Sequence, residues 1–145
     1  GWLRQWDEHG LVSPIVWKDA ERVLSAADVV VLSPEDVGGD QTVLERFRRL
    51  ARLLVVTIGP GGAIVYHEGR QERVPAYAVR EIDPTGAGDV FAAAYFVRFF
   101  ETHDAIESAR FANCTASFVV EDIGANSVPS REQVEQRLLH GSLRD

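Results

Sequence analysis

The chain of 145 residues has no methionine, a single cysteine and no cluster of basic residues. One cysteine excludes an internal disulfide and any metal site that needs several cysteines. Cys114 itself lies in an apolar helical stretch, which favours a small buried side chain. The 15 basic residues are scattered and the net charge is −7. We therefore expect no nucleic-acid partner and no binding to anionic membranes.

Long apolar runs are missing as well. No run reaches the roughly 18 residues that a transmembrane helix requires, and the N-terminus lacks the layout of a signal peptide. We therefore expect a cytoplasmic protein that does not use a membrane. Apolar residues make up 46% of the chain and charged residues 26%, which is ordinary for a globular protein. The length suits one domain with a real core.

What is present is an alternation of helical and strand patterns, which predicts an α/β fold. The expected helices cover residues 18–27, 41–53, 89–101, 104–120 and 131–139. The expected strands cover residues 28–32, 53–58, 63–67 and 73–79. The first two strands are continuous runs rich in β-branched residues, which indicates burial on both faces and a parallel crossover through the helix between them. The last two alternate in polarity, like a hairpin joined at residues 68–70.

Two segments carry narrower expectations. The helix at residues 89–101 is apolar nearly all round, so we expect it to be buried on all sides. The first 17 residues hold all three tryptophans, Trp2, Trp6 and Trp17, in a stretch of mixed polarity that predicts no clear element. We interpret these tryptophans as packing groups and not as a binding cage.

The stretch with the most chemical content is Asp83–Asp89, with the sequence DPTGAGD. Two glycines here lead directly into an apolar helix, whose first N–H groups have no partner within the helix and whose dipole attracts anions. Asp89 adds a carboxylate at the edge of this anion site. Such a pair suits the transfer of a phosphoryl group to a hydroxyl, in which the carboxylate accepts the proton. The alternative is purely structural: a capping aspartate and a tight glycine turn.

Two further loops carry glycines. The segment Thr57–Gly62 follows a predicted parallel strand, at the end where open α/β sheets bind ligands. It fits neither a P-loop, since no Gly-Lys-Ser/Thr follows, nor a dinucleotide fingerprint, since a strand and not a helix comes next. A simple hairpin turn is the alternative. The third loop is Gly124–Pro129, with Asn113 on the helix before it.

Together these residues resemble the ribokinase-like (PfkB) carbohydrate kinases. The DPTGAGD stretch is similar to the family signature, Thr57–Gly62 to its nucleotide loop, Val74–Ala76 to the Val-Pro segment, and Gly124–Pro129 to its closing segment. The resemblance implies a three-layer ribokinase-like fold, here the C-terminal part of a mostly parallel sheet with flanking helices and a β-hairpin. It also implies phosphorylation of a hydroxyl on a sugar or related small molecule, with ATP, Mg²⁺ and, in some members, a monovalent cation such as K⁺.

The resemblance also implies residue roles. Asp89 would be the general base, and the backbone of Gly86, Ala87 and Gly88 would form the anion hole. The residues implied for nucleotide binding are Thr57, Gly59, Gly61, Gly62 and Asn113. The residues implied for metal sites are Asp83 and Thr85, with the backbone of residues 124–127, for the monovalent cation, and Glu35 for Mg²⁺.

The chain departs from the family pattern in three places. Members usually have Asn-x-x-Glu where this chain has Glu35–Gly38, so Glu35 or Asp36 would have to replace the usual metal-binding glutamate. Pro84 stands where threonine is common, and the closing segment is about one residue short. Members are also about twice as long. We therefore expect residues 1–27 to join a missing N-terminal half and residues 28–145 to be the nucleotide-binding and catalytic half.

Three functions remain open at this point. The first is a kinase whose isolated fragment has little activity and associates with itself through surfaces that the missing half would cover. The second is a nucleotide-binding or regulatory module that has lost catalysis, which the Glu35–Gly38 departure favours. The third is a structural domain in which every glycine is only a turn.

Overall fold

The computed structural model describes residues 3–144. The helices are α1 (Ala20–Ala26), α2 (Gln41–Leu50), α3 (Ala87–Thr102), α4 (Ala105–Val119) and α5 (Arg131–His140). The strands are β1 (Arg4–Trp6), β2 (Val12–Pro14), β3 (Val30–Leu32), β4 (Leu53–Thr57), β5 (Ala63–His67) and β6 (Arg70–Val74). Short 3-10 helices are η1 (Pro34–Val37), η2 (Gly59–Gly61) and η3 (Gly124–Ser127). None of the helices in this part of the chain is long and apolar enough to cross a membrane.

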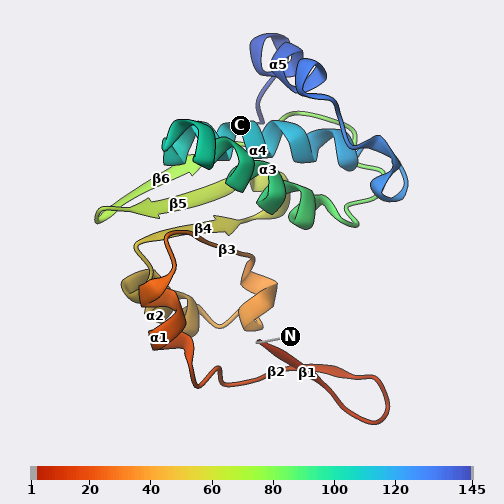
Figure 1. Cartoon of the computed structure of the whole chain (residues 1–145). Helices are drawn as coiled ribbons and strands as arrows, with labels where there is room; N and C mark the ends of the chain where they lie inside the picture. The colour runs from red at the N-terminus through yellow and green to blue at the C-terminus, as the bar shows by residue number, and fades with distance from the viewer. Residues whose placement is uncertain (1–2, 145) are drawn as a thin grey trace.

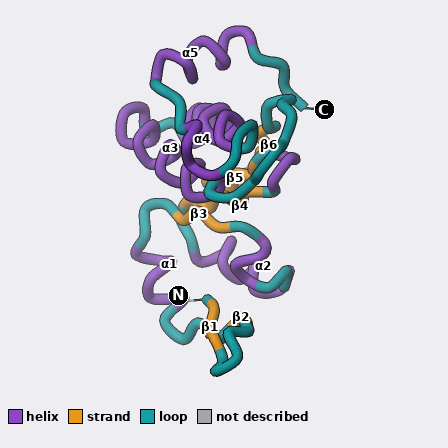
Figure 2. The backbone as a smooth tube through the Cα atoms, turned by 90° about the vertical axis from the view of Figure 1, so that its right-hand side faces the viewer, coloured by secondary structure: helices purple, strands orange, loops and turns teal. Residues whose placement is uncertain are grey.

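The central sheet has the strand order β3-β4-β5-β6, with α3 and α4 on one face and α1 and α2 on the other (Figures 1 and 2). The central strand β4 explains this layering, because its side chains are buried on both faces. Leu53 and Val55 pack in the core with α3 and α4, whereas Leu54 and Val56 pack in the core with α1 and α2. The predicted three-layer α/β fold is confirmed. In this sheet, as the structure describes it, β3 and β4 pair in parallel, whereas the pairs β4–β5 and β5–β6 are antiparallel.

The predicted position of the second hairpin strand is wrong. The strand covers Arg70–Val74 and not residues 73–79, because the hairpin closes through a two-residue turn that pairs His67 with Arg70. Both turn residues, Glu68 and Gly69, have positive φ (51° and 73°), as a tight hairpin turn requires. The segment 75–79 therefore lies outside the hairpin and runs along the cleft described below.

The expectation that the helix at residues 89–101 is buried on all sides is also wrong. Phe91, Ala94 and Tyr95 are buried, at the spacing of one helix face. On the opposite face Val97 is 52% and Phe100 76% exposed. Within the described residues, α3 packs mainly against α4, so its second face meets no neighbour.

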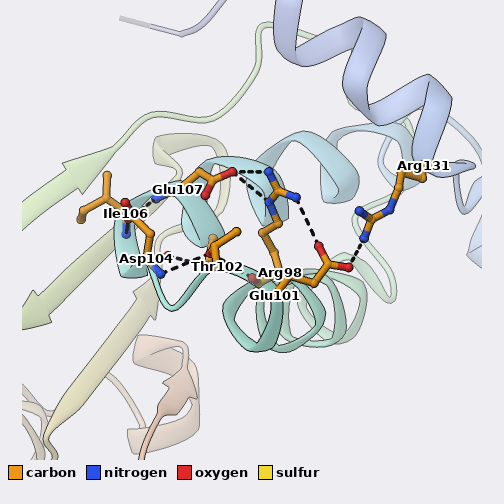
Figure 3. Close-up of polar contacts among 8 residues, drawn as sticks. Arg98, Glu101, Thr102, Asp104, Ile106, Glu107 and Arg131 are labelled. Carbon is orange, nitrogen blue, oxygen red and sulfur yellow. Dashed lines mark hydrogen bonds and ion pairs between the residues drawn. The ribbon is translucent and has the colours of Figure 1, made fainter.

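The three C-terminal helices are joined by charged side chains (Figure 3). Arg98 on α3 binds Glu101 in the next turn and Glu107 on α4, and Arg131 on α5 binds Glu101. The guanidinium groups of Arg98 and Arg131 lie 5.5 and 5.7 Å from the ring centre of Phe111. This network anchors α5, from which the chain returns to the cleft.

The N-terminal segment forms the antiparallel pair β1–β2, for which the sequence predicted no clear element. The interpretation of the tryptophans as packing groups holds for Trp17, whose ring meets Phe47 edge-on at 5.9 Å. It is wrong for Trp6, which is 64% exposed at the end of β1. Trp2 lies outside the described residues.

Candidate functional site

A cleft of about 230 Å³ opens at the carboxyl ends of the parallel strands β3 and β4. Its walls come from the turn after β3, the glycine loop after β4, the segment after β6, the start of α3 and one side of α4. Of the residues that the sequence indicated, it is lined by Glu35, Thr57, Gly59, Gly62, Ala87, Gly88 and Asn113. Loops far apart in the sequence thus meet at the end of the sheet where α/β proteins bind ligands.

The glycine loop after β4 is held tightly at its second end. Gly62 has φ +92°, and a Cβ at this position would come within 2.1 Å of the Val74 carbonyl oxygen. No other residue fits here, because the clash involves backbone atoms. At the first end, the Thr57 hydroxyl lies 3.4 Å from the Leu32 carbonyl oxygen, to which it donates, and so ties the loop to β3. The loop therefore presents a fixed backbone surface to the cleft.

Asn113 fixes the segment that follows β6, against which Gly62 also lies. Its side chain is buried, and its amide Nδ2 donates to the carbonyl oxygens of Val74 and Pro75 at 3.0 and 3.1 Å. Both amide hydrogens are thus used to hold the segment after β6 against α4. Only the Asn113 carbonyl oxygen is left to face a ligand in the cleft.

The N-terminus of α3 differs from those of α2, α4 and α5. Those three helices begin at Asp40, Asp104 and Ser130, whose side chains accept hydrogen bonds from the first-turn N–H groups. At α3 the capping position is Gly86, with φ +83° and no side chain. The N–H groups in the first turn of α3 therefore have no capping side chain as acceptor. This is favourable for anion binding, because an anion needs these N–H groups to be free.

The N–H groups at the start of α3 are not equivalent. The Ala87 N–H donates to the Pro84 carbonyl oxygen at 3.1 Å, so it is already used within the loop. Within the described residues, the N–H groups of Gly88 and Asp89 have no such partner. Gly88 also leaves its surroundings open, since nothing lies within 4 Å of the point that a Cβ would occupy. The open part of the helix end is therefore at Gly88 and Asp89.

Asp89 occupies the third position of α3 and is exposed. It follows Gly88, a lining residue, but does not line the cleft itself. Asp83 and Thr85 flank the lining residue Pro84, Gly86 precedes Ala87, and Gly61 lies between Pro60 and Gly62. These five predicted residues therefore lie at the rim, next to residues that line the cleft.

Asp83 connects two of the loops. One carboxylate oxygen accepts from the Thr85 N–H at 2.9 Å and the other from the Gly124 N–H at 3.2 Å. Hydrogen bonds from the Thr85 hydroxyl, the Thr85 N–H and the Gly124 N–H hold the pKa of the Asp83 carboxyl below its usual range. The signature loop and the closing loop are thus joined by a hydrogen bond.

The turn after β3 supplies one carboxylate to the cleft. Glu35 lines it, whereas the Asp36 carboxylate accepts from the Ser33 N–H at 2.8 Å and from the Ser33 hydroxyl at 3.2 Å and so caps η1. Gly38, at the position of the usual glutamate, adopts φ 64° and has no side chain to contribute. Among the described residues, no three His, Cys, Asp or Glu side chains gather as a ready-made metal site.

Sequence reasoning missed several lining residues, chiefly on the segment after β6 and on the C-terminal tail. They include Tyr77, Val79, Glu81, Ser117 and Arg144. The tail had no local signal, because its place depends on pairing with residues about 65 positions earlier in the chain.

The comparison with protein families matches residues 18–132 to the pfkB family carbohydrate kinases. The chain is similar to fructokinase-1 of Zea mays, with 30% identity over 130 residues that cover 83% of this chain and 40% of the relative. It thus spans about two fifths of the length of that relative.

Comparison with solved structures shows a similar fold. A Methanocaldococcus jannaschii nucleoside kinase, an archaeal member of the ribokinase family, has the same fold, with a TM-score of 0.71 at 24% identity over 84% of this chain and 46% of that one. A Vibrio cholerae fructokinase bound to fructose, ADP and calcium has a TM-score of 0.69 at 28% identity over 81% of this chain and 42% of that one. The family match covers well over half of the sequence and confirms the resemblance of the motifs: the chain belongs to the pfkB family of carbohydrate kinases.

Proposed function

We propose that this chain carries the nucleotide-binding and catalytic-base part of a kinase that transfers a phosphoryl group from ATP to a hydroxyl of a sugar or related small molecule. The observation that carries the proposal is the cleft, in which the glycine loop after β4 faces the uncapped N-terminus of α3. Similarity to fructokinases and to a nucleoside kinase supports a hydroxyl acceptor of this class.

The proposed chemistry follows from the open groups of the cleft. The nucleotide lies between the Gly59–Gly62 loop and Asn113, and its phosphates point toward α3. The N–H groups of Gly88 and Asp89, together with the helix dipole, stabilise the negative charge that develops on the transferred group. The Asp89 carboxylate, one residue from the cleft lining, accepts the proton of the attacking hydroxyl. Asp83 positions the loop and does not react.

The chain fits the metal ions that the family implies. Mg²⁺ usually keeps several waters and binds one or two carboxylates together with substrate phosphates. Glu35 supplies one such carboxylate on the cleft wall. A monovalent cation would be held by Asp83 and Thr85 with backbone of the 124–127 loop, which the Asp83–Gly124 bond brings close. Both ions would neutralise phosphate charge.

A second candidate function is a nucleotide-binding module without efficient catalysis. It is favoured by Gly38, which removes the carboxylate that members of the family usually have at this position. Under this alternative ATP binds, but transfer is slow because the usual metal-binding glutamate is missing and Glu35 or Asp36 would have to replace it. We expect the isolated chain to show little or no turnover in either case, because it does not include the substrate-binding half that the resemblance implies.

The test of phosphoryl transfer measures turnover of a protein that contains both this chain and the proposed substrate-binding part. Asp89→Asn should lower kcat by about 10²-fold or more, since general-base catalysis contributes that much. ATP affinity should stay near that of the unmodified protein, because Asp89 lies outside the cleft lining. Glu132→Gln, an exposed change on α5, is the control. Unchanged turnover of the Asp89→Asn variant would contradict the assignment of Asp89 as the base. ATP binding without phosphoryl transfer in the unmodified protein would favour the second function.

The remaining proposals concern the whole protein. We take residues 28–145 as the nucleotide-binding and catalytic part and residues 1–27 as the junction to the substrate-binding part. The partners are then a small-molecule substrate and a second copy of the chain. We also propose a cytoplasmic location, where ATP is available.

A further inference from the structure

The chain returns to the cleft after α5 as a short tail. The Ala78 N–H donates to the Ser142 carbonyl oxygen and the Arg144 N–H donates to the Ala76 carbonyl oxygen, both at 2.8 Å. Between them, Tyr77 and Leu143 form an antiparallel bridge. The tail is therefore one more extended segment, docked on the segment after β6 by main-chain bonds.

The side chain of Arg144 ends at the cleft. Its Nη2 donates to the Val79 carbonyl oxygen at 2.9 Å, and the residue is half-buried in the cleft wall. A guanidinium has five N–H donors. Within the described part of the chain, the Val79 oxygen is the one acceptor that its side chain has. A planar cation with several unused donors thus borders a cleft with mostly apolar walls.

The position of Arg144 along the cleft determines which part of a bound nucleotide would lie next to it. The segment after β6, on which the tail docks, is tied at residues 74 and 75 to Asn113, and Gly62 lies against the same residues. The open phosphate-binding groups are at the other end, at Gly88. Arg144 therefore borders the part of the cleft between Asn113 and the start of α3, on the side of the base and ribose.

We propose that Arg144 binds the nucleoside part of the nucleotide, by stacking its guanidinium plane on the base and donating to base or ribose acceptors. The inference rests on the proposed function. Guanidinium groups stack on aromatic faces and are more weakly hydrated than ammonium groups, so this environment suits arginine better than lysine. Arg144 lies beyond the matched family region, which covers residues 18–132.

Titration calorimetry with ATP, ADP and AMP tests the proposal. Arg144→Ala should weaken the binding of all three nucleotides by about the same factor, roughly tenfold, as expected for the loss of one stacked or hydrogen-bonded cation. Arg144→Lys should recover little of it, because lysine keeps the charge but not the plane. Arg80→Ala is the matched control: it removes the same charge from an exposed neighbour of Val79.

The possible failures are distinguishable. Unchanged affinity in Arg144→Ala, or a loss that grows from AMP to ATP, would overturn the nucleoside contact and leave the proposed function intact. Absence of nucleotide binding in the unmodified chain would overturn both. A thermal melt checks folding; the main-chain bond of Arg144 to Ala76 survives the substitution, so the melting temperature should change little.

Discussion

At the scale of single residues, a substitution of Gly88 should change stability and ATP binding in opposite directions. It stands at the second position of α3, with open space where a Cβ would lie. Gly88→Ala should raise the free energy of unfolding by about 0.5–1 kcal/mol, because alanine loses less backbone entropy in a helix. The same methyl group enters the cleft, so ATP binding should weaken. Denaturant unfolding and calorimetry on one preparation measure both effects; an alanine variant that binds ATP as tightly as the unmodified chain would contradict the phosphate site.

Asp83 gives a prediction about pH. Its carboxyl pKa is lower in the folded chain because Thr85 and Gly124 donate to it. The unfolded chain therefore binds more protons in the window between the two pKa values, and stability rises with pH there. The contribution of Asp83 is complete above its unfolded pKa, about 3.9, and is lost as the pH falls through the lower folded pKa.

Asp83→Asn should consequently flatten the dependence of stability on pH below about pH 4. It should also loosen the 124–127 loop, which loses its acceptor for the Gly124 N–H. Urea unfolding at a series of acidic pH values measures the slope, and amide hydrogen exchange at Gly124 reports the loop. A slope as steep as in the unmodified chain would show that the bridge does not contribute.

At the scale of elements, Glu101 joins α3 to α5 by accepting from both Arg98 and Arg131 (Figure 3). Glu101→Gln should lower the free energy of unfolding only slightly, since these exposed pairs are screened by water. Faster hydrogen exchange in α5 and in the tail should accompany it. Glu135→Gln, exposed on α5, is the control. Equal exchange rates in the two variants would mean that α5 is held by its apolar face alone.

The elements also show how far the sequence could predict this fold. The buried strand β4 and the helix α5 were predicted because their patterns are local. The hairpin strand differs from the prediction because the turn at Glu68 and Gly69 closes in two residues, and the strand that follows, Arg70–Val74, begins with four polar residues and shows no alternation in polarity. The exposed face of α3 could not be predicted, since composition does not reveal which neighbours a helix will meet.

The candidate site was predictable to a similar degree. Glycine loops and the signature aspartates are visible as motifs, and the cleft brings seven of the predicted residues to its walls. The unequal use of the N–H groups at Ala87 and Gly88 depends on loop geometry, which no motif encodes. Arg144 was missed because only tertiary pairing brings the tail to the segment after β6.

At the scale of the whole molecule, apolar surface remains uncovered. Phe100 is 76% and Val97 52% exposed on α3, and β3 forms an open edge of the described sheet. We expect the chain to associate with a second copy at high concentration, because such surfaces favour self-association. Phe100→Glu should shift sedimentation toward the monomer.

Leu139→Glu is the control for this prediction, since Leu139 is similarly exposed on α5 (73%) and away from that face. Equal effects of the two changes would indicate non-specific association. A clean monomer of the unmodified chain at high concentration would refute the prediction outright.

The proposed function depends on the cleft being an ATP site. The most direct measurement is a titration of the isotope-labelled chain with ATP and Mg²⁺, followed by amide NMR. We expect saturable chemical-shift changes at Gly59, Gly62 and Gly88 and in the segment 76–79, with β1–β2 unaffected. Shifts confined to other surfaces, or none at millimolar ATP, would contradict it.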